Sequence, residues 1–282
     1  MHTIVAARLA ALRHARGLSM KTAADAAGLN TSTVYRVEHG HVAPRESTTD
    51  TLLELYGVHD AAQRRHVLAL LRGERRPGWF DAPEIPLWLS RFLALEDEAA
   101  RVDAYAPMFV PALLQTPAYA EATVRACGHP GMTSQQVQAG AGTILRRQEL
   151  LDRDGGPLVR AVVDRRALLD PPLACPADRV AQVDAIAAAA RRPGVAVQVA
   201  RPCTETGHLY HGPPFTLLGF AGRDRPGVLV LHLLHGSTVV DDPGTVEAHE
   251  EAFARLSRSA HDVAETPAVL DGIRAELTAL TT

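Results

Sequence analysis

Residues 19–44 of the 282-residue chain carry the pattern that most restricts how it can fold. Ser19 is a residue type that caps the start of helices, and Gly28 readily adopts the left-handed conformation that ends them. Asn30 offers a cap for a second helix, which Gly40 closes. The pattern therefore predicts two short helices joined by a tight turn, the layout of a helix-turn-helix.

The same stretch resembles the Xre/Cro-type, lambda-repressor-like regulators. The resemblance rests on Gly28-Leu29-Asn30, Val34, Glu38, Gly40 and Pro44. It implies that the second helix presents its N-terminal end to the major groove of DNA. The positions that match base-reading residues of that family are Thr31, Ser32 and Arg36, and the adjacent Tyr35 is expected to contact bases with them.

The chemistry of these side chains suits that role. Arginine can bind guanine through two hydrogen bonds, whereas Ser and Thr hydroxyls accept several bases. Backbone N–H groups at Ser19 and Met20, together with Lys21 and Arg45, are expected to hold phosphates. Met20 stands where the Xre family usually has Gln. The alternative interpretation of residues 19–44 is an ordinary alanine-rich helical hairpin.

The charge of the chain is unevenly distributed. Its net charge is −3, which is not typical of a nucleic-acid-binding protein, but residues 1–49 hold six basic and three acidic groups, a local +3. Such a small excess supports only modest affinity for phosphates. We therefore expect a homodimer that doubles the contacts on a double-stranded DNA operator.

No run of 18 apolar residues and no basic-then-apolar leader occurs in the sequence. We therefore expect a cytoplasmic protein without a membrane segment.

The sequence predicts two domains. Residues 1–72 are expected to form an all-α helix-turn-helix domain of five helices, and residues 73–86, with three prolines and two glycines, a linker. Residues 87–282 show helical patterns, then strand patterns, then helices, which predicts an α+β domain with a small antiparallel sheet.

Within the second domain, apolar residues three and four apart predict a helix over residues 87–105. Residues 215–220 and 228–234 alternate as strands around a turn and predict an antiparallel hairpin.

A second set of motifs begins in the predicted linker and continues to Phe215. It consists of Trp79-Phe80-Asp81, Leu95-Glu96, Ala99-Ala100, Tyr105, Val110 to Thr116, Tyr119-Ala120, Arg147-Gln148 and Gly212 to Phe215. Together these are similar to the C-terminal domain of the WhiJ-like group of actinobacterial Xre-type regulators. The resemblance implies a regulator of development or specialised metabolism, often encoded beside a small partner protein in an antitoxin-like pairing.

Two positions depart from the WhiJ-like pattern. Arg165 stands where that group has an acidic residue after the first strand, and His232 and His235 replace its Tyr-x-Glu. Any partner or effector contact of the group through these positions is therefore altered here.

No motif for catalysis or for a cofactor is found, so we expect no enzyme and no cofactor. His232 and His235 lie three apart in a predicted strand and so point to opposite faces. We expect solvent-facing histidines and no metal site. The acidic Glu96, Asp97 and Glu98 are expected to form a solvated face.

The cysteines Cys127, Cys175 and Cys203 lie far apart, without the spacing of a zinc site, and are expected to pack in the core.

The loop over residues 201–215 is the most open question. It contains His208, Tyr210, His211 and Phe215 between two predicted strands, and long loops often carry function. It is a candidate for binding a small-molecule effector or a partner protein. Two rival functions follow: an antitoxin-like protein that sequesters a partner, and a ligand-sensing repressor.

Overall fold

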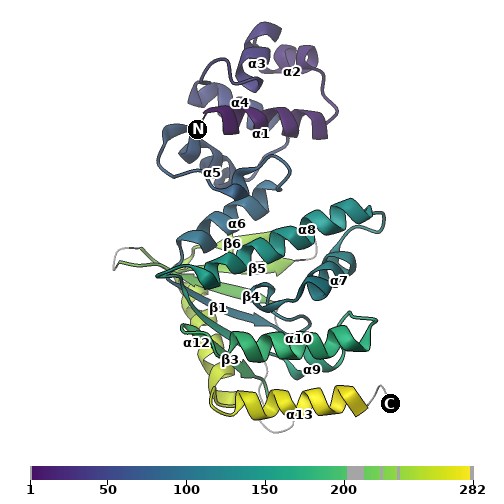
Figure 1. Cartoon of the computed structure of the whole chain (residues 1–282). Coiled ribbons are helices and arrows are strands. Elements are labelled where there is room, and N and C mark those ends of the chain that lie inside the picture. The colour runs from purple at the N-terminus through teal and green to yellow at the C-terminus, as the bar shows by residue number, and fades with distance from the viewer. Residues whose placement is uncertain (1, 202–212, 223–224, 234–235, 280–282) are drawn as a thin grey trace. The chain divides into compact units, whose positions relative to one another are not determined.

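The computed structural model describes residues 2–201, 213–222, 225–233 and 236–279 and divides into two units (Figure 1). Unit 1 contains residues 1–94 and unit 2 residues 95–282. Unit 1 is all-helical, as predicted. Its helices are α1 (His2–Ala15), α2 (Met20–Ala27), α3 (Thr31–Glu38), α4 (Glu46–Leu55), α5 (Ala61–Arg72), the 3-10 helix η1 (Trp79–Asp81) and α6 (Leu87–Glu98), which continues into unit 2.

Local signals set the ends of α2 and α3. Ser19 caps α2, and its Oγ accepts a hydrogen bond from the N–H of Thr22 at 3.0 Å. Gly28 ends α2 with a φ of 66°, which glycine adopts without the steric cost that a side chain would add. Asn30 occupies the N-cap of α3, but its side chain makes no capping hydrogen bond.

A buried ion pair joins three helices of unit 1. Nε of Arg13 in α1 donates to both carboxylate oxygens of Glu38, at 2.9 and 3.0 Å. The hydroxyl of Tyr56, which follows α4, donates to Glu38 Oε1 at 2.8 Å. Burial and the carboxylate together raise the pKa of Tyr56. Glu38, at the last position of α3, is therefore tied to both α1 and the end of α4.

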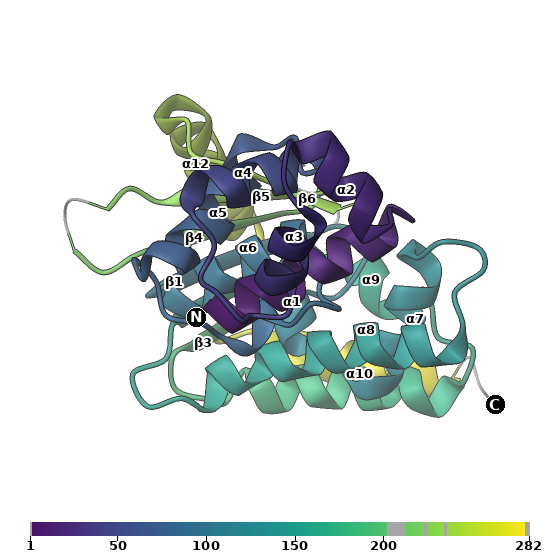
Figure 2. The ribbon, with the colours of Figure 1, turned by 90° about the horizontal axis from the view of Figure 1, so that it is seen from above.

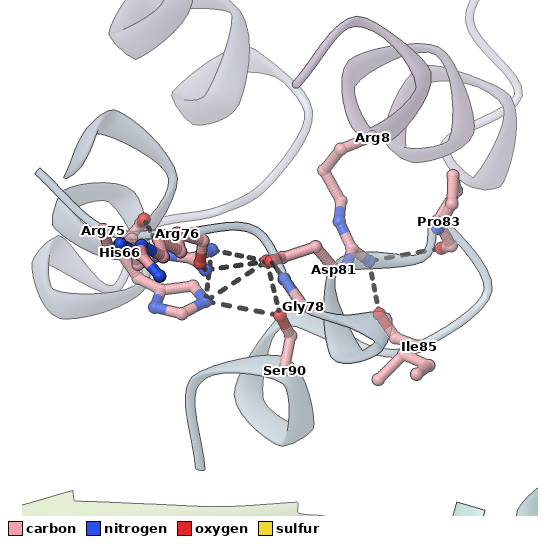
Figure 3. Close-up of polar contacts among 9 residues, drawn as sticks. All are labelled: Arg8, His66, Arg75, Arg76, Gly78, Asp81, Pro83, Ile85 and Ser90. Atoms are coloured by element: carbon pink, nitrogen blue, oxygen red, sulfur yellow. Dashed lines mark hydrogen bonds and ion pairs between the residues drawn. The ribbon is translucent and has the colours of Figure 1, made fainter. Parts of the chain in front are cut away.

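The predicted linker is part of unit 1 rather than a free connector (Figure 3). The guanidinium of Arg75 pairs with both oxygens of Asp81, and the N–H of Gly78 donates to the same carboxylate at 2.9 Å. The buried guanidinium of Arg8 in α1 donates to the carbonyl oxygens of Pro83 and Ile85. Proline and glycine break the helical period here, but these bonds hold the irregular backbone in place.

His66 in α5 completes this network in its neutral form. Burial lowers the pKa of His66 to about 3, and the positive charge of Arg75 adds to the effect. Nε2 of His66 lies 3.1 Å from Nη2 of Arg75, and because a guanidinium only donates, Nε2 must be the unprotonated nitrogen. Asp81, in contrast to the neutral His66, is charged in this network. Its burial would raise its pKa, but the bonds from Arg75 and Gly78 lower it overall, so the carboxylate stays charged.

Unit 2 is built on one six-stranded sheet. Its strands are β1 (Arg101–Ala106), β2 (Leu158–Val163), β3 (Val195–Val199), β4 (Phe215–Gly219), β5 (Val228–Leu233) and β6 (Gly236–Val240). Its helical elements are η2 (Ala112–Leu114), α7 (Pro117–Cys127), α8 (Ser134–Arg147), η3 (Gln148–Asp152), α9 (Arg165–Leu169), α10 (Pro176–Ala189), α12 (Pro243–Ser259) and α13 (Thr266–Ala279).

The sheet is larger than predicted and mixed. Its strand order is β3-β2-β1-β4-β5-β6. Strands β1, β2 and β3 are parallel, whereas β4, β5 and β6 continue antiparallel. The predicted β4–β5 hairpin is confirmed, with Phe215 opposite Leu231. The α+β class is also confirmed.

The predicted helix over residues 87–105 is wrong at its C-terminal end. Helix α6 stops at Glu98, and residues 101–106 are β1, a central strand. The apolar residues of β1 fit a strand pattern as well as a helical one. Hydrogen bonding to a neighbouring strand on each side, β2 and β4, selects the strand. In that pairing Asp103 lies opposite Arg160 of β2 and Leu217 of β4.

Helices cover both faces of this sheet (Figure 2). Helix α12 lies on one face, where its Phe253 and Leu256 pack on Tyr105, Phe215 and Leu217. The other face bears small and branched residues such as Val102 and Ala161, and α8 and α10 lie over it.

The expected solvated face over Glu96, Asp97 and Glu98 is wrong for Glu96, whereas Glu98 is exposed and Asp97 is half-buried. Glu96 is 1% exposed and pairs with Arg147 at the end of α8, at 2.7 and 2.8 Å. Asp97 pairs with Arg153 and Glu98 with Arg225. The partners come from distant parts of the chain, which local charge patterning could not reveal.

Within the described part of the chain, none of the helices has the length and apolarity needed to cross a lipid bilayer.

The Arg13–Glu38 pair predicts a large loss of stability on mutation. Glu38→Gln leaves the buried guanidinium of Arg13 without its counter-charge, so we expect it to lower the unfolding free energy of unit 1 by about 3–5 kcal/mol. Tyr56→Phe, which removes one hydrogen bond, should cost about 1 kcal/mol. Both tryptophans of the chain, Trp79 and Trp88, lie in unit 1, so tryptophan fluorescence during denaturation reports on this unit.

The matched control is the exposed pair of Arg72 and Glu46, at 2.7 Å. Glu46→Gln should cost less than about 1 kcal/mol because solvent screens this pair. Equal losses for Glu38→Gln and Glu46→Gln would contradict the structural role of the buried pair.

The neutral state of His66 predicts that unit 1 is acid-labile. As pH falls from about 6.5 toward 3, the unfolded chain binds a proton on His66 that the folded unit does not, so stability decreases through this range. Protonation of Asp81, whose folded pKa is depressed, acts in the same direction. The full effect of His66 is on the order of a few kcal/mol.

Tryptophan-monitored denaturation between pH 7.5 and 4.5 measures this slope. His66→Gln should flatten it, whereas substitution of the exposed His59 by Gln should leave it unchanged. An unchanged slope in His66→Gln would rule out His66 as its source.

Candidate nucleic-acid interface

Helices α2 and α3 lie side by side in unit 1 (Figure 1). One face of α3 is anchored in the core through Val34, Val37 and Glu38, all of which are buried. Its opposite face is polar and open. All four predicted base-reading residues, Thr31, Ser32, Tyr35 and Arg36, are exposed on α3.

The predicted phosphate-binding residues surround the start of α2 and of α4. Lys21 and Arg45 are exposed, and Arg45 is the N-cap of α4. The Oγ of Ser19 is occupied by its cap, so only backbone groups remain available there. The N–H groups of Met20 and Lys21, in the first turn of α2, have no described acceptor. An open helix N-terminus of this kind suits an anion.

The local charge of +3 overstates what this surface offers. Arg8 and Arg13 are each 4% exposed and bind groups inside unit 1. Burial lowers the pKa of Arg8. The exposed cations of residues 1–49 are Arg16, Lys21, Arg36 and Arg45. The formal charge of a sequence does not distinguish a cation at the surface from one that is buried and bonded inside the fold.

The sequence analysis missed an aromatic cluster beside Arg36. The ring of Tyr35 stacks on that of His39, with centroids 4.0 Å apart, and the ring of His41 lies 5.8 Å from Tyr35. His39 Nδ1 also lies 2.8 Å from the Tyr35 carbonyl oxygen. The spacing of four residues along a helix could have signalled the Tyr35–His39 contact. Tyr35 therefore belongs to a cluster of three rings with His39 and His41.

In unit 2, the motif residues mainly hold the backbone together. Nε2 of Gln148 donates to the carbonyl oxygens of Ala112 and Gln115 at 3.1 and 2.7 Å. The buried hydroxyl of Tyr119 accepts from the N–H of Val110 at 3.0 Å and donates to the carbonyl of Ala167 at 3.2 Å. Burial raises the pKa of Tyr119 to about 12. These side chains stabilise the segment after β1 instead of facing a ligand.

His232 is not the solvent-facing histidine that the sequence suggested. Its Nε2 lies 2.9 Å from Thr216 Oγ1 and its Nδ1 3.1 Å from Ser237 Oγ. Burial lowers the pKa of His232 to about 4, and the charge of Arg147 adds to this shift. The imidazole is therefore neutral at physiological pH and joins three strands.

The candidate effector loop is only partly described. Tyr210, His208 and His211 lie outside the described residues. Phe215 is not a loop residue, because it is 1% exposed in β4 and packs edge-on against Phe253. Its apolar ring is used by the core of unit 2.

Two further expectations concern cysteine and metal. Cys127 and Cys175 are exposed, so the expected core packing is wrong for both. Cys127 is the last residue of α7 and Cys175 the N-cap of α10, two positions at which a helix meets solvent. Among the described residues, no group of three or more His, Cys, Asp or Glu side chains could hold a metal ion.

Two family models match two successive parts of the chain. A helix-turn-helix domain family matches residues 4–67, and a domain of unknown function, DUF5753, matches residues 89–272. The chain matches no curated protein and no solved structure. The helix-turn-helix match agrees with the geometry of α2 and α3, and it places the protein among DNA-binding transcription regulators. The chain thus belongs to the DUF5753 family and carries its domain behind an N-terminal helix-turn-helix domain.

Proposed function

We propose that the protein is a sequence-specific regulator that binds a double-stranded DNA operator as a homodimer, with α3 in the major groove. The observation that carries this proposal is the two-sided character of α3. Its inner face is fixed by Val34, Val37 and Glu38, and its outer face presents Thr31, Ser32 and Arg36 to solvent. A reading helix needs both, because base contacts require a rigid backbone behind exposed polar side chains.

Each exposed residue has a distinct task in this proposal. Arg36 reads a guanine through its guanidinium, and Thr31 and Ser32 contact base edges near the start of α3. Tyr35, whose ring stacks on that of His39, contacts a base beside the one that Arg36 reads. Lys21, Arg45 and the N–H groups at the start of α2 bind phosphates and so set the register of α3.

A dimer follows from the small number of exposed cations. The four cations on the surface of residues 1–49 release few counterions from one half-site. Two copies on a two-fold symmetric operator double the phosphate contacts and the base readout. Unit 2, in this proposal, provides the dimer contacts and the regulatory input.

The resemblance to WhiJ-like regulators suggests what that input is. In this proposal, a small partner protein encoded nearby binds unit 2 and changes operator occupancy, and the genes controlled concern development or specialised metabolism. Co-purification of the tagged protein from its native host tests this part. Mapping of its chromosomal positions by crosslinking and sequencing identifies the operator, and the absence of any recurrent sequence motif would overturn the proposed function.

Arg36 and Arg45 predict different kinds of loss in DNA binding. Arg36→Ala should cost about 1–3 kcal/mol on the operator and relax the preference at one base position. Arg45→Ala should weaken binding to all sequences and reduce the slope of affinity against salt by about one phosphate contact. Fluorescence anisotropy on operator and scrambled duplexes, across a salt series, separates the two effects.

A matched control is Arg65→Ala, which removes an exposed arginine of unit 1 from α5, outside the helix-turn-helix. It should change neither preference nor salt slope. If Arg36→Ala weakened operator and scrambled DNA equally, Arg36 would not be a base-reading residue.

A further inference from the structure

Strand β6 forms one edge of the sheet, and its outer side has unused hydrogen-bonding groups. The N–H of His232 donates to the carbonyl of Pro214 on the β4 side at 3.0 Å, so the backbone groups of His232 point away from β6. Ser237 lies opposite His232 in the β5–β6 pair. In such a pair the N–H and C=O of both residues point outward. Those of Ser237 and Val239 therefore point away from the sheet, and no described residue bonds to them.

At the opposite edge of the same sheet, outward carbonyl groups of β3 are hydrogen-bonded. The hydroxyl of Thr266 donates to the outward carbonyl of Val197 in β3 at 2.7 Å, and the N–H of His261 donates to that of Val199 at 2.9 Å. The segment between α12 and α13 thus covers β3. The chain protects one edge with its own residues and leaves the other unpaired within its described part.

Strand β6 also lacks the features that keep exposed edges apart. Its sequence is GSTVV, without charge and without proline. Lysine, inward-pointing charges and proline are the usual means of preventing one edge from pairing with another. The first charged residue, Asp241, follows the end of the strand.

We propose that β6 pairs antiparallel with β6 of a second copy, so that two six-stranded sheets become continuous across a two-fold axis. This inference rests on the homodimer of the proposed function and names its interface. One register uses every outward group: Ser237 of each copy lies opposite Val239 of the other, and the two Thr238 residues lie opposite each other. The N–H and C=O of Ser237 and Val239 then form four hydrogen bonds between the copies.

A second copy fits this edge because the arrangement is self-complementary. An isologous contact needs a surface that matches itself after a two-fold rotation, and this uncharged strand does so around Thr238. The same symmetry suits an operator with two half-sites. The strand pairing has fewer hydrogen bonds than a typical protein interface. We therefore expect a weak dimer in free solution that two-fold operator DNA strengthens.

Thr238→Cys tests the pairing in a full-length chain in which Cys127, Cys175 and Cys203 are replaced by Ser. Residues in a non-hydrogen-bonded antiparallel pair have Cα atoms about 4.5 Å apart, within the range that a disulfide spans. Mild oxidation should give a disulfide-linked dimer at position 238. The control Ala275→Cys, exposed on α13 away from β6, should remain monomeric on the same gel.

Charge substitutions at the same position give an independent test by sedimentation. Thr238→Lys and Thr238→Glu should each shift the protein to monomer, and an equimolar mixture of the two should restore a dimer, while Thr238→Val should leave it unchanged. No crosslink from Thr238→Cys, or a Thr238→Lys protein as dimeric as wild type, overturns the interface.

Operator binding is measured separately to distinguish the two hypotheses. A crosslinked dimer that binds no specific DNA would sink the proposed function and leave the interface standing. If the wild-type protein binds its operator specifically but the Thr238→Cys protein gives no crosslink, only the interface is overturned.

Discussion

The position of the exposed face of α3 depends on the hydrogen bonds that the carboxylate of Glu38 receives. It lies at the end of α3 and receives hydrogen bonds from Arg13 of α1 and from Tyr56 after α4. A buried charge is tolerated only when its lone pairs are satisfied, so the three helices must meet in one arrangement. The same hydrogen bonds fix the backbone that carries the exposed face of α3. Arg36 lies two positions before Glu38, so its backbone is held by the same contacts.

Arginine performs two opposite tasks in unit 1. Arg8, Arg13 and Arg75 stabilise the fold, since each guanidinium binds carbonyl or carboxylate groups inside the unit. Lys21, Arg36 and Arg45 remain at the surface. The first group holds the helices and the segment over residues 73–86 together, and the second leaves exposed positive charge that the proposed function assigns to DNA contact. A protein of net charge −3 can therefore still present a small basic face.

In unit 2, amide and carboxylate side chains likewise bond to groups within the unit. Glu96 pairs with Arg147, and Gln148 next to it holds the carbonyls of Ala112 and Gln115. Tyr119 and His232 are likewise neutral and fully engaged. These motif residues thus bond to other groups of the folded unit. The groups that unit 2 leaves unpaired in its described part include the backbone along the outer side of β6.

Short-range patterns in the sequence were sufficient to determine α1 to α5, the turn at Gly28 and the exposed positions of α3, because capping, glycine conformation and helical period act within a few residues. The helical and strand composition of unit 2 was also readable as α+β. Only the tertiary structure decided that residues 101–106 form a central strand, since two neighbouring strands supply the hydrogen bonds that a helix would have made internally. It alone showed that Glu96 and Arg13 are both buried in ion pairs, because their partners lie 51 and 25 residues away along the chain. Long-range pairing of charges and strand order are properties of the folded chain, and no local pattern encodes them.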